Sequence, residues 1–276
     1  MSRFSVVVPA FNASDTITET LDALVSQTLR DWECIVVDDG STDDTLALAK
    51  KYEAADQRFQ VISQENRGTG GAYNAGVRAA RADWITICSA DDVLLPPHLE
   101  AMSEAVERFP GYDIYSCNGY FWHPDDSRVL VYSEEDMREP RSWSLEETLA
   151  KCFYSVGACY RRSLFGALGG YLEDAYGEDY DFWLRALASG AKHLYVPEAL
   201  TLHRKSGAQK SANLRKAYEG DIRSIHKLLE SGALSVRQEK AARDAIRHRK
   251  RMTLGLGSVG GLAVRILRGA RASLRG

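Results

Sequence analysis

The sequence predicts an α/β fold in which a mostly parallel, twisted sheet is flanked by helices. Between residues 4 and 92, short apolar segments alternate with longer segments in which apolar residues recur at helical spacing. Short apolar runs are typical of buried strands, and the longer pattern is typical of amphipathic helices. Strands that alternate with helices favour right-handed crossovers and parallel strand neighbours.

The first half of the chain carries the regular part of this pattern. Ser14 or Asp15 is expected to cap the first helix, and Asp43–Asp44 to open the second. A third helix follows the glycine-rich loop at residues 66–71. The expected strands are Phe4–Val8, Glu33–Val37, Phe59–Ile62 and Trp84–Cys88.

After residue 94 the alternation weakens. Pro96–Pro97 opens a helix that runs to about Phe109, and residues 213–252 are typical of two further helices. We expect this mixed half to add strands to the sheet and to build a pocket over the first half. Its expected strands are 113–117, 128–132, 192–196 and 199–202, and its other expected helices are 144–152 and 179–189.

The composition is that of an ordinary globular protein, with 45% hydrophobic and 26% charged residues in a chain of 276. Its five cysteines are scattered and form no C-x-x-C pair, which favours a reducing cytoplasm over secretion. The first strand begins so close to the start that we expect no signal peptide. No apolar stretch reaches transmembrane length.

Charge is spread unevenly along the chain. Residues 237–276 contain 11 Lys and Arg and 2 acids, a net charge of +9, so the remaining residues carry −12 of the total of −3. An acidic body argues against a nucleic-acid-binding core. A basic tail is suited to an anionic surface.

Acidic clusters are the main candidates for chemistry. Asp38–Asp39 and Asp91–Asp92 each follow an apolar strand, so both are expected at the same edge of the parallel sheet, where ligands bind in open α/β folds. Asp39 is placed to accept a hydrogen bond from a base or ribose of a mononucleotide. Asp91 and Asp92 would lie near phosphates, which requires a bridging Mg²⁺ or Mn²⁺. The alternative for both pairs is solvated turn and helix-cap chemistry.

The third cluster, Glu178–Asp179, opens a helix. Acids at a helix N-terminus commonly stabilise the helix dipole, which is one interpretation of the pair. In the other, Asp179 is a general base that deprotonates an acceptor hydroxyl, and Glu178 orients the acceptor or raises the pKa of the base.

Two basic segments are weaker candidates. Arg67, in the glycine-rich loop, could contact a phosphate or a base. His203 is a candidate metal ligand, and the following Arg204 and Lys205 are candidates for a pyrophosphate clamp. A plain surface-charge role is the alternative for the second segment.

With these residues in place, the chain resembles a family 2 glycosyltransferase of the GT-A fold over residues 4–205. Each matching motif is weak alone, but together they occur in one order, which makes the resemblance specific. The motifs are Val6–Asn12, Ser26–Thr28, Val36–Asp43, Asn66–Gly68, Asn74–Gly76, Ala90–Asp92, Gly169–Tyr171 and Glu178–Arg185.

The resemblance implies a nucleotide-diphospho-sugar donor, a divalent metal (Mn²⁺ or Mg²⁺) and inversion at the anomeric carbon. Asp179 would be the catalytic base. Asp92 would bind the metal, and Asp91 would meet the ribose or the metal; His203 stays a candidate metal ligand from its position, which the resemblance does not decide. The implied donor-binding residues are Pro9, Phe11, Asn12, Asp39, Arg67, Gly68 and Asp91.

Two positions depart from the family pattern. Ser89 stands where many relatives carry an Asp, which leaves the metal site one carboxylate fewer. Tyr73 stands where many carry an Arg, so the phosphate contacts would fall to Arg67 or Arg204.

The expected organisation is a GT-A domain at residues 1–210, with a nucleotide-binding half at 1–95 and an acceptor-binding half at 96–210. A helical, basic extension occupies 211–276. The acceptor is expected to be a glycan or a lipid-linked saccharide, bound by Glu178, Trp122 and Trp143, because aromatic rings stack on sugar faces. Core packing is the alternative for each tryptophan.

The last segment, residues 253–276, mixes apolar residues with arginines and is suited to an anionic membrane. We therefore expect a cytoplasmic protein that associates peripherally with the inner membrane face through this tail. A disordered or oligomerising tail is the alternative, and the oligomeric state stays open.

Two other functions compete with an active transferase. A GT-A scaffold could bind a sugar nucleotide without turnover. A nucleotidyltransferase would require a glycine-rich, basic loop after the first strand, where this chain has Pro9–Asn12. The sequence does not identify the sugar or its nucleotide carrier; UDP is the default expectation, and dTDP and GDP stay open.

Overall fold

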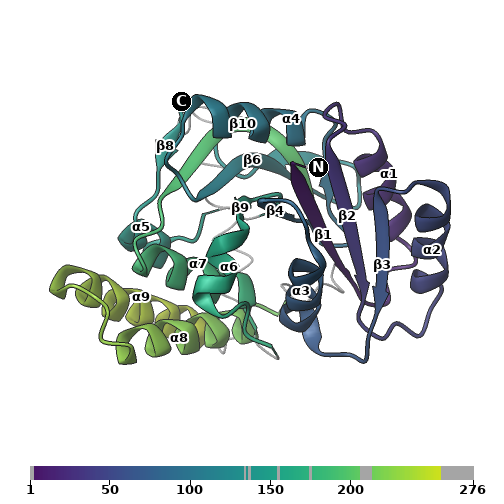
Figure 1. Cartoon of the computed structure of the whole chain (residues 1–276). Helices are drawn as coiled ribbons and strands as arrows, with labels where there is room; N and C mark the ends of the chain where they lie inside the picture. The colour runs from purple at the N-terminus through teal and green to yellow at the C-terminus, as the bar shows by residue number, and fades with distance from the viewer. Residues whose placement is uncertain are drawn as a thin grey trace.

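The computed structural model describes residues 3–133, 135, 138–153, 156–173, 176–205 and 213–255. One mixed sheet forms the centre of the molecule, with helices on both faces (Figure 1). Eight strands follow the order β3-β2-β1-β4-β9-β6-β10-β5, and β7 and β8 pair with β6 and β10. The predicted α/β class with a mostly parallel, flanked sheet is confirmed.

The N-terminal half is parallel, as predicted. Strand β1 (Phe4–Ala10) pairs with β2 (Trp32–Asp38) on one side and with β4 (Trp84–Ile87) on the other. Strand β3 (Phe59–Ser63) extends the sheet beyond β2. Every residue of β1 and β2 is buried, which explains their continuous apolar runs. Because the chain returns to the far side of β1 after β3, the carboxyl ends of β1, β2 and β4 meet at a switch point.

The C-terminal half adds antiparallel pairs that the sequence did not reveal. Strand β9 (Cys159–Arg161) lies between β4 and β6 (Ile114–Trp122) and is antiparallel to both. The two strands expected at 192–196 and 199–202 form one strand, β10 (His193–Arg204), because two register shifts accommodate the residues around Pro197. The remaining short strands are β5 (Val93–Leu94), β7 (Arg128–Leu130) and β8 (Arg141–Ser142).

Helices cover the two faces of the sheet with separate apolar cores. One core contains apolar side chains of α1 (Ile17–Val25), α2 (Thr45–Ala55) and α4 (His98–Arg108). The other contains side chains of α3, α5 and α7, with α6 packed against it. The bounds of this second set are α3 Gly68–Ala79, α5 Leu145–Ala150, α6 Arg162–Leu168 and α7 Glu178–Ala188.

The expected cap of the first helix is wrong. Helix α1 follows Thr16 and has no side-chain cap. The backbone N–H of Ser14 instead donates to Asp43 Oδ2, so this loop is tied to the loop before α2. Asp43 is thereby engaged by another loop as well as by Thr45, the first residue of α2.

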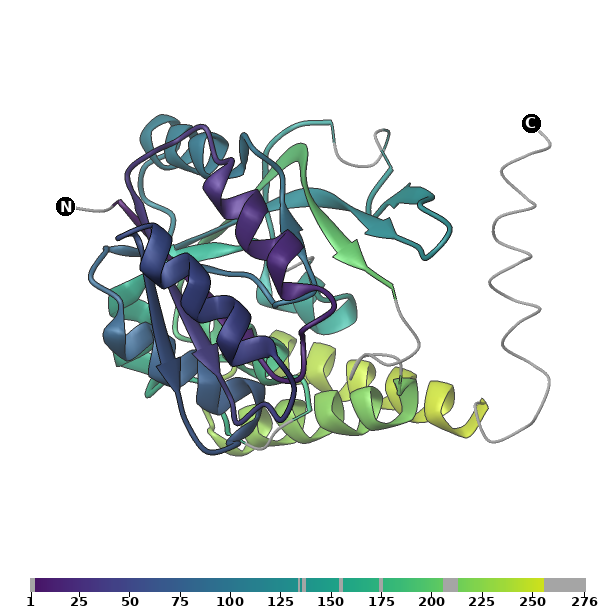
Figure 2. The same ribbon diagram turned by 90° about the vertical axis from the view of Figure 1, so that its right-hand side faces the viewer.

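Helices α8 (Leu214–Glu230) and α9 (Val236–Gly255) lie side by side beneath α5 and α7 (Figures 1 and 2). Ile225 and Ile246 belong to the same buried core as the sheet. The expected domain boundary near residue 210 and the tail from residue 256 lie outside the described residues. Among those that are described, no helix is both long and apolar enough to cross a membrane.

Candidate active site

A cavity of about 1350 Å³ opens at the switch point of the sheet. It is lined by residues that follow β1, β2 and β4, by the start of α7 and by the end of β10. The topology therefore brings the acidic clusters to one cavity. The predicted site residues that line it are Pro9, Phe11, Asn12, Asp39, Asp91, Asp92, Glu178, Asp179 and His203.

Asp39 lines one part of the cavity and is held in place by two hydrogen bonds from the protein. This carboxylate is 3% exposed, and its Oδ1 accepts hydrogen bonds from Gln64 Nε2 (2.7 Å) and from the Arg67 backbone N–H (2.9 Å). With one oxygen held by the protein, the carboxylate has a defined orientation. Gln64 was not singled out from the sequence, because nothing local marks a strand-end glutamine as a partner of Asp39.

Asn12 and Phe11 form the lip beside Asp39. Asn12 adopts a left-handed backbone with φ 48°, and its Oδ1 accepts from the Thr42 backbone N–H at 2.9 Å. This contact joins the loop after β1 to the loop after β2. Phe11 is 51% exposed at the cavity, so its ring is available to stack on a planar ligand.

Arg67 and Gly68 do not line the cavity among its described residues. Arg67 Nη2 donates to both carboxylate oxygens of Glu173, at 2.9 and 2.7 Å. The predicted contact between Arg67 and a phosphate or base is therefore not made by the side chain in this arrangement. Gly68 begins α3 with φ 72°, a conformation that favours glycine.

Asp92 and His203 meet at the centre of the cavity wall. Leu202 of β10 pairs with Val93 of β5, and this register sets His203 Nδ1 3.0 Å from Asp92 Oδ1. The Arg204 backbone N–H donates to the same oxygen at 3.2 Å. Burial raises the pKa of the Asp92 carboxyl, and the contact with His203 opposes that rise.

The donor set at this point fits a divalent cation. Asp92 is only 2% exposed, and among the described residues its Oδ2 accepts no hydrogen bond. Enclosing the charge of a carboxylate in protein is costly unless an opposite charge, such as a cation, lies beside it. Carboxylate oxygen and imidazole nitrogen are ligands that Mn²⁺ accepts. Within the described residues, no group of three or more His, Cys, Asp or Glu side chains is already gathered for a metal.

The two departures from the family pattern also face the cavity. Ser89 and Tyr73 both line it, and Tyr73 is 5% exposed. The Tyr73 ring packs on that of Tyr171, with centroids 5.0 Å apart. Burial raises the pKa of the Tyr73 phenol well above its usual value, so this side chain is a neutral group.

The opposite wall carries Glu178 and Asp179 at the first turn of α7. Gly177 precedes them with φ 79°, and Asp179 Oδ1 accepts from the Tyr180 backbone N–H at 2.7 Å. Further along the helix, Asp181 pairs with Arg185, which also donates to backbone carbonyls of the preceding loop. The helix is thus anchored, and its first turn presents two carboxylates to the cavity.

The two tryptophans expected at the acceptor are placed elsewhere. Trp143 is 7% exposed and packs against Tyr132 and Phe153 in the core, with ring centroids 5.8 and 6.5 Å away. Trp122 is not among the lining residues. Its Nε1 donates to Asp126, and the Arg204 guanidinium lies 4.1 Å from its ring centre. Among the described residues that line the cavity, neither tryptophan is present: Trp143 fills the core, and Trp122 stacks under Arg204.

Other residues line this side of the cavity and were missed by the sequence analysis. Phe153 and Tyr176 supply aromatic surface, and α8 contributes Ala217 and Asp221. These segments are far apart in the sequence, so no local pattern shows that they line the same cavity. Helix α8 has no local feature that marks it as part of a site.

A mixed sheet of this order, with acidic side chains gathered at its switch point, defines a protein of the GT-A glycosyltransferase class. The chain belongs to glycosyl transferase family 2, whose family model matches residues 5–169.

Curated relatives include two glycosyltransferases of Bacillus subtilis. EpsJ, which is uncharacterised, is 29% identical over 213 residues, and EpsH is 30% identical over 204 residues. These matches cover 73% and 70% of this chain, but only 61% and 58% of the relatives, so the chain spans less than two thirds of their length. Chondroitin synthase of Escherichia coli is 32% identical over 161 residues, which are 52% of this chain and 23% of that protein.

Solved structures share the fold. S. aureus TarS 1-349 in complex with UDP-GlcNAc superposes with a TM-score of 0.76 and 19% identity, covering 96% of this chain and 78% of the TarS 1-349 chain. The mannosyltransferase PcManGT from Pyrobaculum calidifontis, in complex with GDP-Man and Mn²⁺, gives 0.68 and 20% identity, covering 99% and 80%. At this identity the likeness establishes the fold.

Proposed function

We propose that the protein is an inverting, divalent-metal-dependent glycosyltransferase. It would move a sugar from a nucleotide-diphospho-sugar, with UDP as the favoured carrier, to a hydroxyl of a glycan or lipid-linked acceptor. The observation that carries this proposal is that Asp39, Asp92 and Asp179 line one cavity. TarS and PcManGT, which share the fold, have been solved with UDP-GlcNAc and GDP-Man.

The donor would bind at the Asp39 end. Asp39 accepts a hydrogen bond from the imide N–H of the base through the oxygen that Gln64 does not hold, and Phe11 stacks on the base. Asp92 and His203, with Asp91, would hold the metal beside the diphosphate. The metal, when bound, supplies charge neutralisation for the departing diphosphate.

The acceptor would enter at the α7 end. Asp179 takes the proton of the acceptor hydroxyl while that oxygen attacks the anomeric carbon, and the bond from this carbon to the diphosphate oxygen breaks. Attack from the side opposite the leaving group inverts the anomeric configuration. The cavity supplies the positioning of the two substrates, which is a large part of the rate enhancement.

A screen of nucleotide sugars tests this function. A ligand that binds only the folded state raises the melting temperature, so we expect one nucleotide sugar to stabilise the protein when Mn²⁺ is present. Transfer with that donor should release the nucleoside diphosphate and give a product of opposite anomeric configuration by proton NMR. Stabilisation by no sugar nucleotide, or retention of configuration, would count against the proposal.

The alternatives give different products. A nucleotidyltransferase would release pyrophosphate from a nucleoside triphosphate, and a scaffold would bind the donor without turnover. Pro9–Asn12, at the end of β1 and directly after it, line the cavity, and they are not the glycine-rich basic loop that a nucleotidyltransferase requires. We infer a cytoplasmic role in cell-surface polysaccharide synthesis, with peripheral membrane contact through the tail.

A further inference from the structure

Helix α8 forms part of the wall of the candidate active site. Its residues Ala217 and Asp221 line the cavity together with Tyr176, Gly177 and Asp179. The Asp221 side chain is 22% exposed, so it is partly open to the cavity and partly enclosed by protein. A carboxylate at this position is not explained by helix stability, because it lies in the middle of α8 rather than at its first turn.

A buried arginine of α9 holds one oxygen of this carboxylate. The Arg249 side chain is 6% exposed, and its Nε donates to Asp221 Oδ2 at 2.8 Å. Its terminal nitrogens donate to the Leu149 carbonyl at 2.8 Å and to Tyr180 Oη at 2.9 Å. Three fixed partners orient the guanidinium, and the guanidinium in turn orients Asp221.

The second oxygen of Asp221 lies over the turn that leads into α7. A Cβ atom built on Gly177 would lie 3.3 Å from Asp221 Oδ1. Among the described residues, Oδ1 accepts no hydrogen bond, although it is next to the turn that precedes Glu178 and Asp179. Burial raises the pKa of Asp221, the charge and hydrogen bond of Arg249 oppose that rise, and the charge of Asp179 adds a smaller rise.

We propose that Asp221 binds a hydroxyl group of the acceptor saccharide beside the hydroxyl that Asp179 deprotonates, with Arg249 as its positioning residue. An ionised carboxylate only accepts hydrogen bonds, so it recognises donors such as sugar hydroxyls. The inference rests on the proposed function and deepens it, since it makes the α8–α9 pair part of acceptor recognition.

A purely structural role for the ion pair makes a different prediction. In that case the Asp221–Arg249 pair only attaches α9 to the rest of the fold. Removing one partner would leave an uncompensated buried charge and destabilise the protein, whereas replacing both with apolar residues often restores stability. The double variant Asp221→Leu/Arg249→Met therefore distinguishes a role in holding α9 to the fold from a role in binding the acceptor saccharide.

The test compares binding of two probes to the full chain. Saturation-transfer NMR measures the binding of methyl glycosides of glucose, galactose, mannose and N-acetylglucosamine in the presence of UDP and Mn²⁺. Calorimetry measures the affinity for UDP, which serves as the internal reference. We expect Asp221→Asn to weaken the glycosides that the wild type binds by about tenfold or more, as for loss of a charged hydrogen bond. The double variant should regain its melting temperature without regaining glycoside binding.

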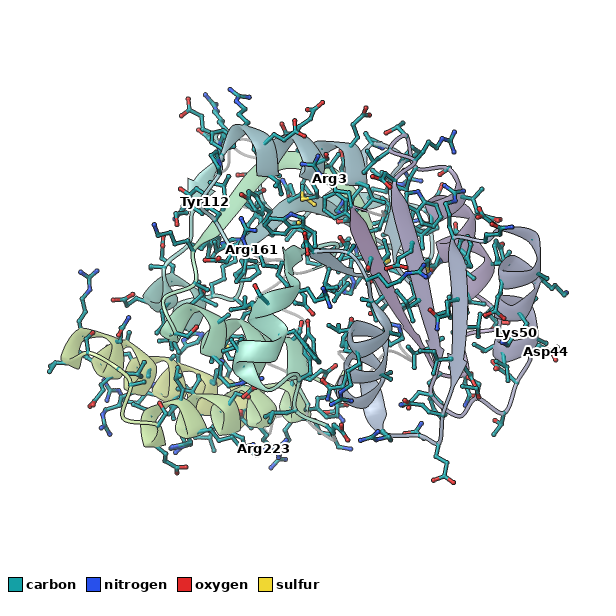
Figure 3. All side chains as sticks on the ribbon, in the orientation of Figure 1. Arg3, Asp44, Lys50, Tyr112, Arg161 and Arg223 are labelled. Atoms are coloured by element: carbon teal, nitrogen blue, oxygen red, sulfur yellow. The ribbon has the colours of Figure 1, made fainter. Side chains whose placement is uncertain are left out.

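Arg223→Gln is the matched control. Arg223 lies on α8 two positions from Asp221 and is exposed, and Figure 3 shows it projecting from the outer side of the helix. This variant should bind the glycosides like the wild type.

Three results would overturn the proposal: wild-type affinity in Asp221→Asn, recovery of glycoside binding in the double variant, or a wild type that binds none of the glycosides. Absence of any donor turnover would count against the proposed function alone, because the glycoside measurement does not require turnover.

Discussion

Asp92 and His203 are 111 positions apart in the chain, yet Asp92 Oδ1 and His203 Nδ1 are 3.0 Å apart in the fold. The antiparallel pairing of β5 with β10 creates this contact. It places an imidazole beside a buried carboxylate at the switch point, next to Asp91. The contact supports the interpretation of this point as a metal site and leads to the first prediction.

Asp92→Asn is expected to abolish metal-dependent turnover. An amide lacks the charge that a divalent cation requires, so we expect the rate of donor hydrolysis with Mn²⁺ to fall by about a hundredfold or more. Release of the nucleoside diphosphate over a Mn²⁺ titration measures the effect. Asp126→Asn is the control, because the Asp126 side chain is 78% exposed and is not among the residues that line the cavity. Full activity of Asp92→Asn at low Mn²⁺ would contradict the metal assignment.

Asp179→Asn should impair the chemical step more than donor binding. Loss of a general base typically lowers kcat by about 10²- to 10⁴-fold. The nucleoside diphosphate should still bind, because its proposed contacts, Asp39 and Phe11, are unchanged in this variant. Steady-state kinetics and calorimetry with UDP separate the two effects. If transfer continues at the wild-type rate, another residue is the base.

Gln64→Ala is expected to weaken nucleotide binding without changing the chemistry. Gln64 Nε2 donates to Asp39 Oδ1 at 2.7 Å, so its loss frees the carboxylate to rotate. One lost hydrogen bond is worth about 0.5–1.5 kcal/mol, or roughly a two- to tenfold rise in the dissociation constant. Calorimetry with UDP measures this change. Gln60→Ala, at an exposed position of β3, should bind UDP normally, and equal affinities of the two variants would contradict the role of Gln64.

Stability should decline in mild acid because two histidines are buried in neutral form. Burial lowers the pKa of His98 to about 4 and that of His193 to about 3. An unfolded histidine titrates near 6.5, so below that pH the unfolded chain binds more protons than the folded chain, and protonation favours unfolding. We expect the free energy of unfolding to fall by about 1.4 kcal/mol per pH unit for each histidine between roughly pH 6 and the folded pKa values. Urea unfolding at pH 7, 6 and 5 measures it.

His193→Gln tests the origin of this pH dependence. His193 is fully buried, stacks on Phe153 and contacts Ser116 Oγ through Nε2 at 2.7 Å. The variant should have a shallower pH dependence than the wild type, whatever its absolute stability, because one titrating group is gone. His226→Gln, on the exposed face of α8, should keep the wild-type slope. An unchanged slope in His193→Gln would contradict the prediction.

The parallel half of the fold was predictable because its signals are local. Strands buried on both faces read as uninterrupted apolar runs, and β1, β2, β3 and β4 were found with bounds within two residues. Strand β9 was missed, since three residues, Cys159–Arg161, are too few to show a period. The single strand β10 was divided in two, because Pro197 normally interrupts a ladder and only the register shifts accommodate it.

The part of the candidate site that could be predicted is the part that the order of the strands determines. Parallel strands end at one edge, so the carboxylates that follow β2 and β4 had to lie near each other. The roles of Arg67, Trp122 and Trp143 were judged from residue type, and residue type does not reveal side-chain partners. Glu173 engages Arg67, and the core encloses Trp143.

The sequence by itself determined the α/β class, the family and the acidic clusters, because these depend on short-range patterns and on the order of motifs. The tertiary structure decided that His203 meets Asp92 and that α8 and α9 bring Asp221 and Arg249 to the cavity. Such contacts join segments far apart in the chain. They depend on strand register and helix packing, which the whole core determines together and which no local pattern encodes.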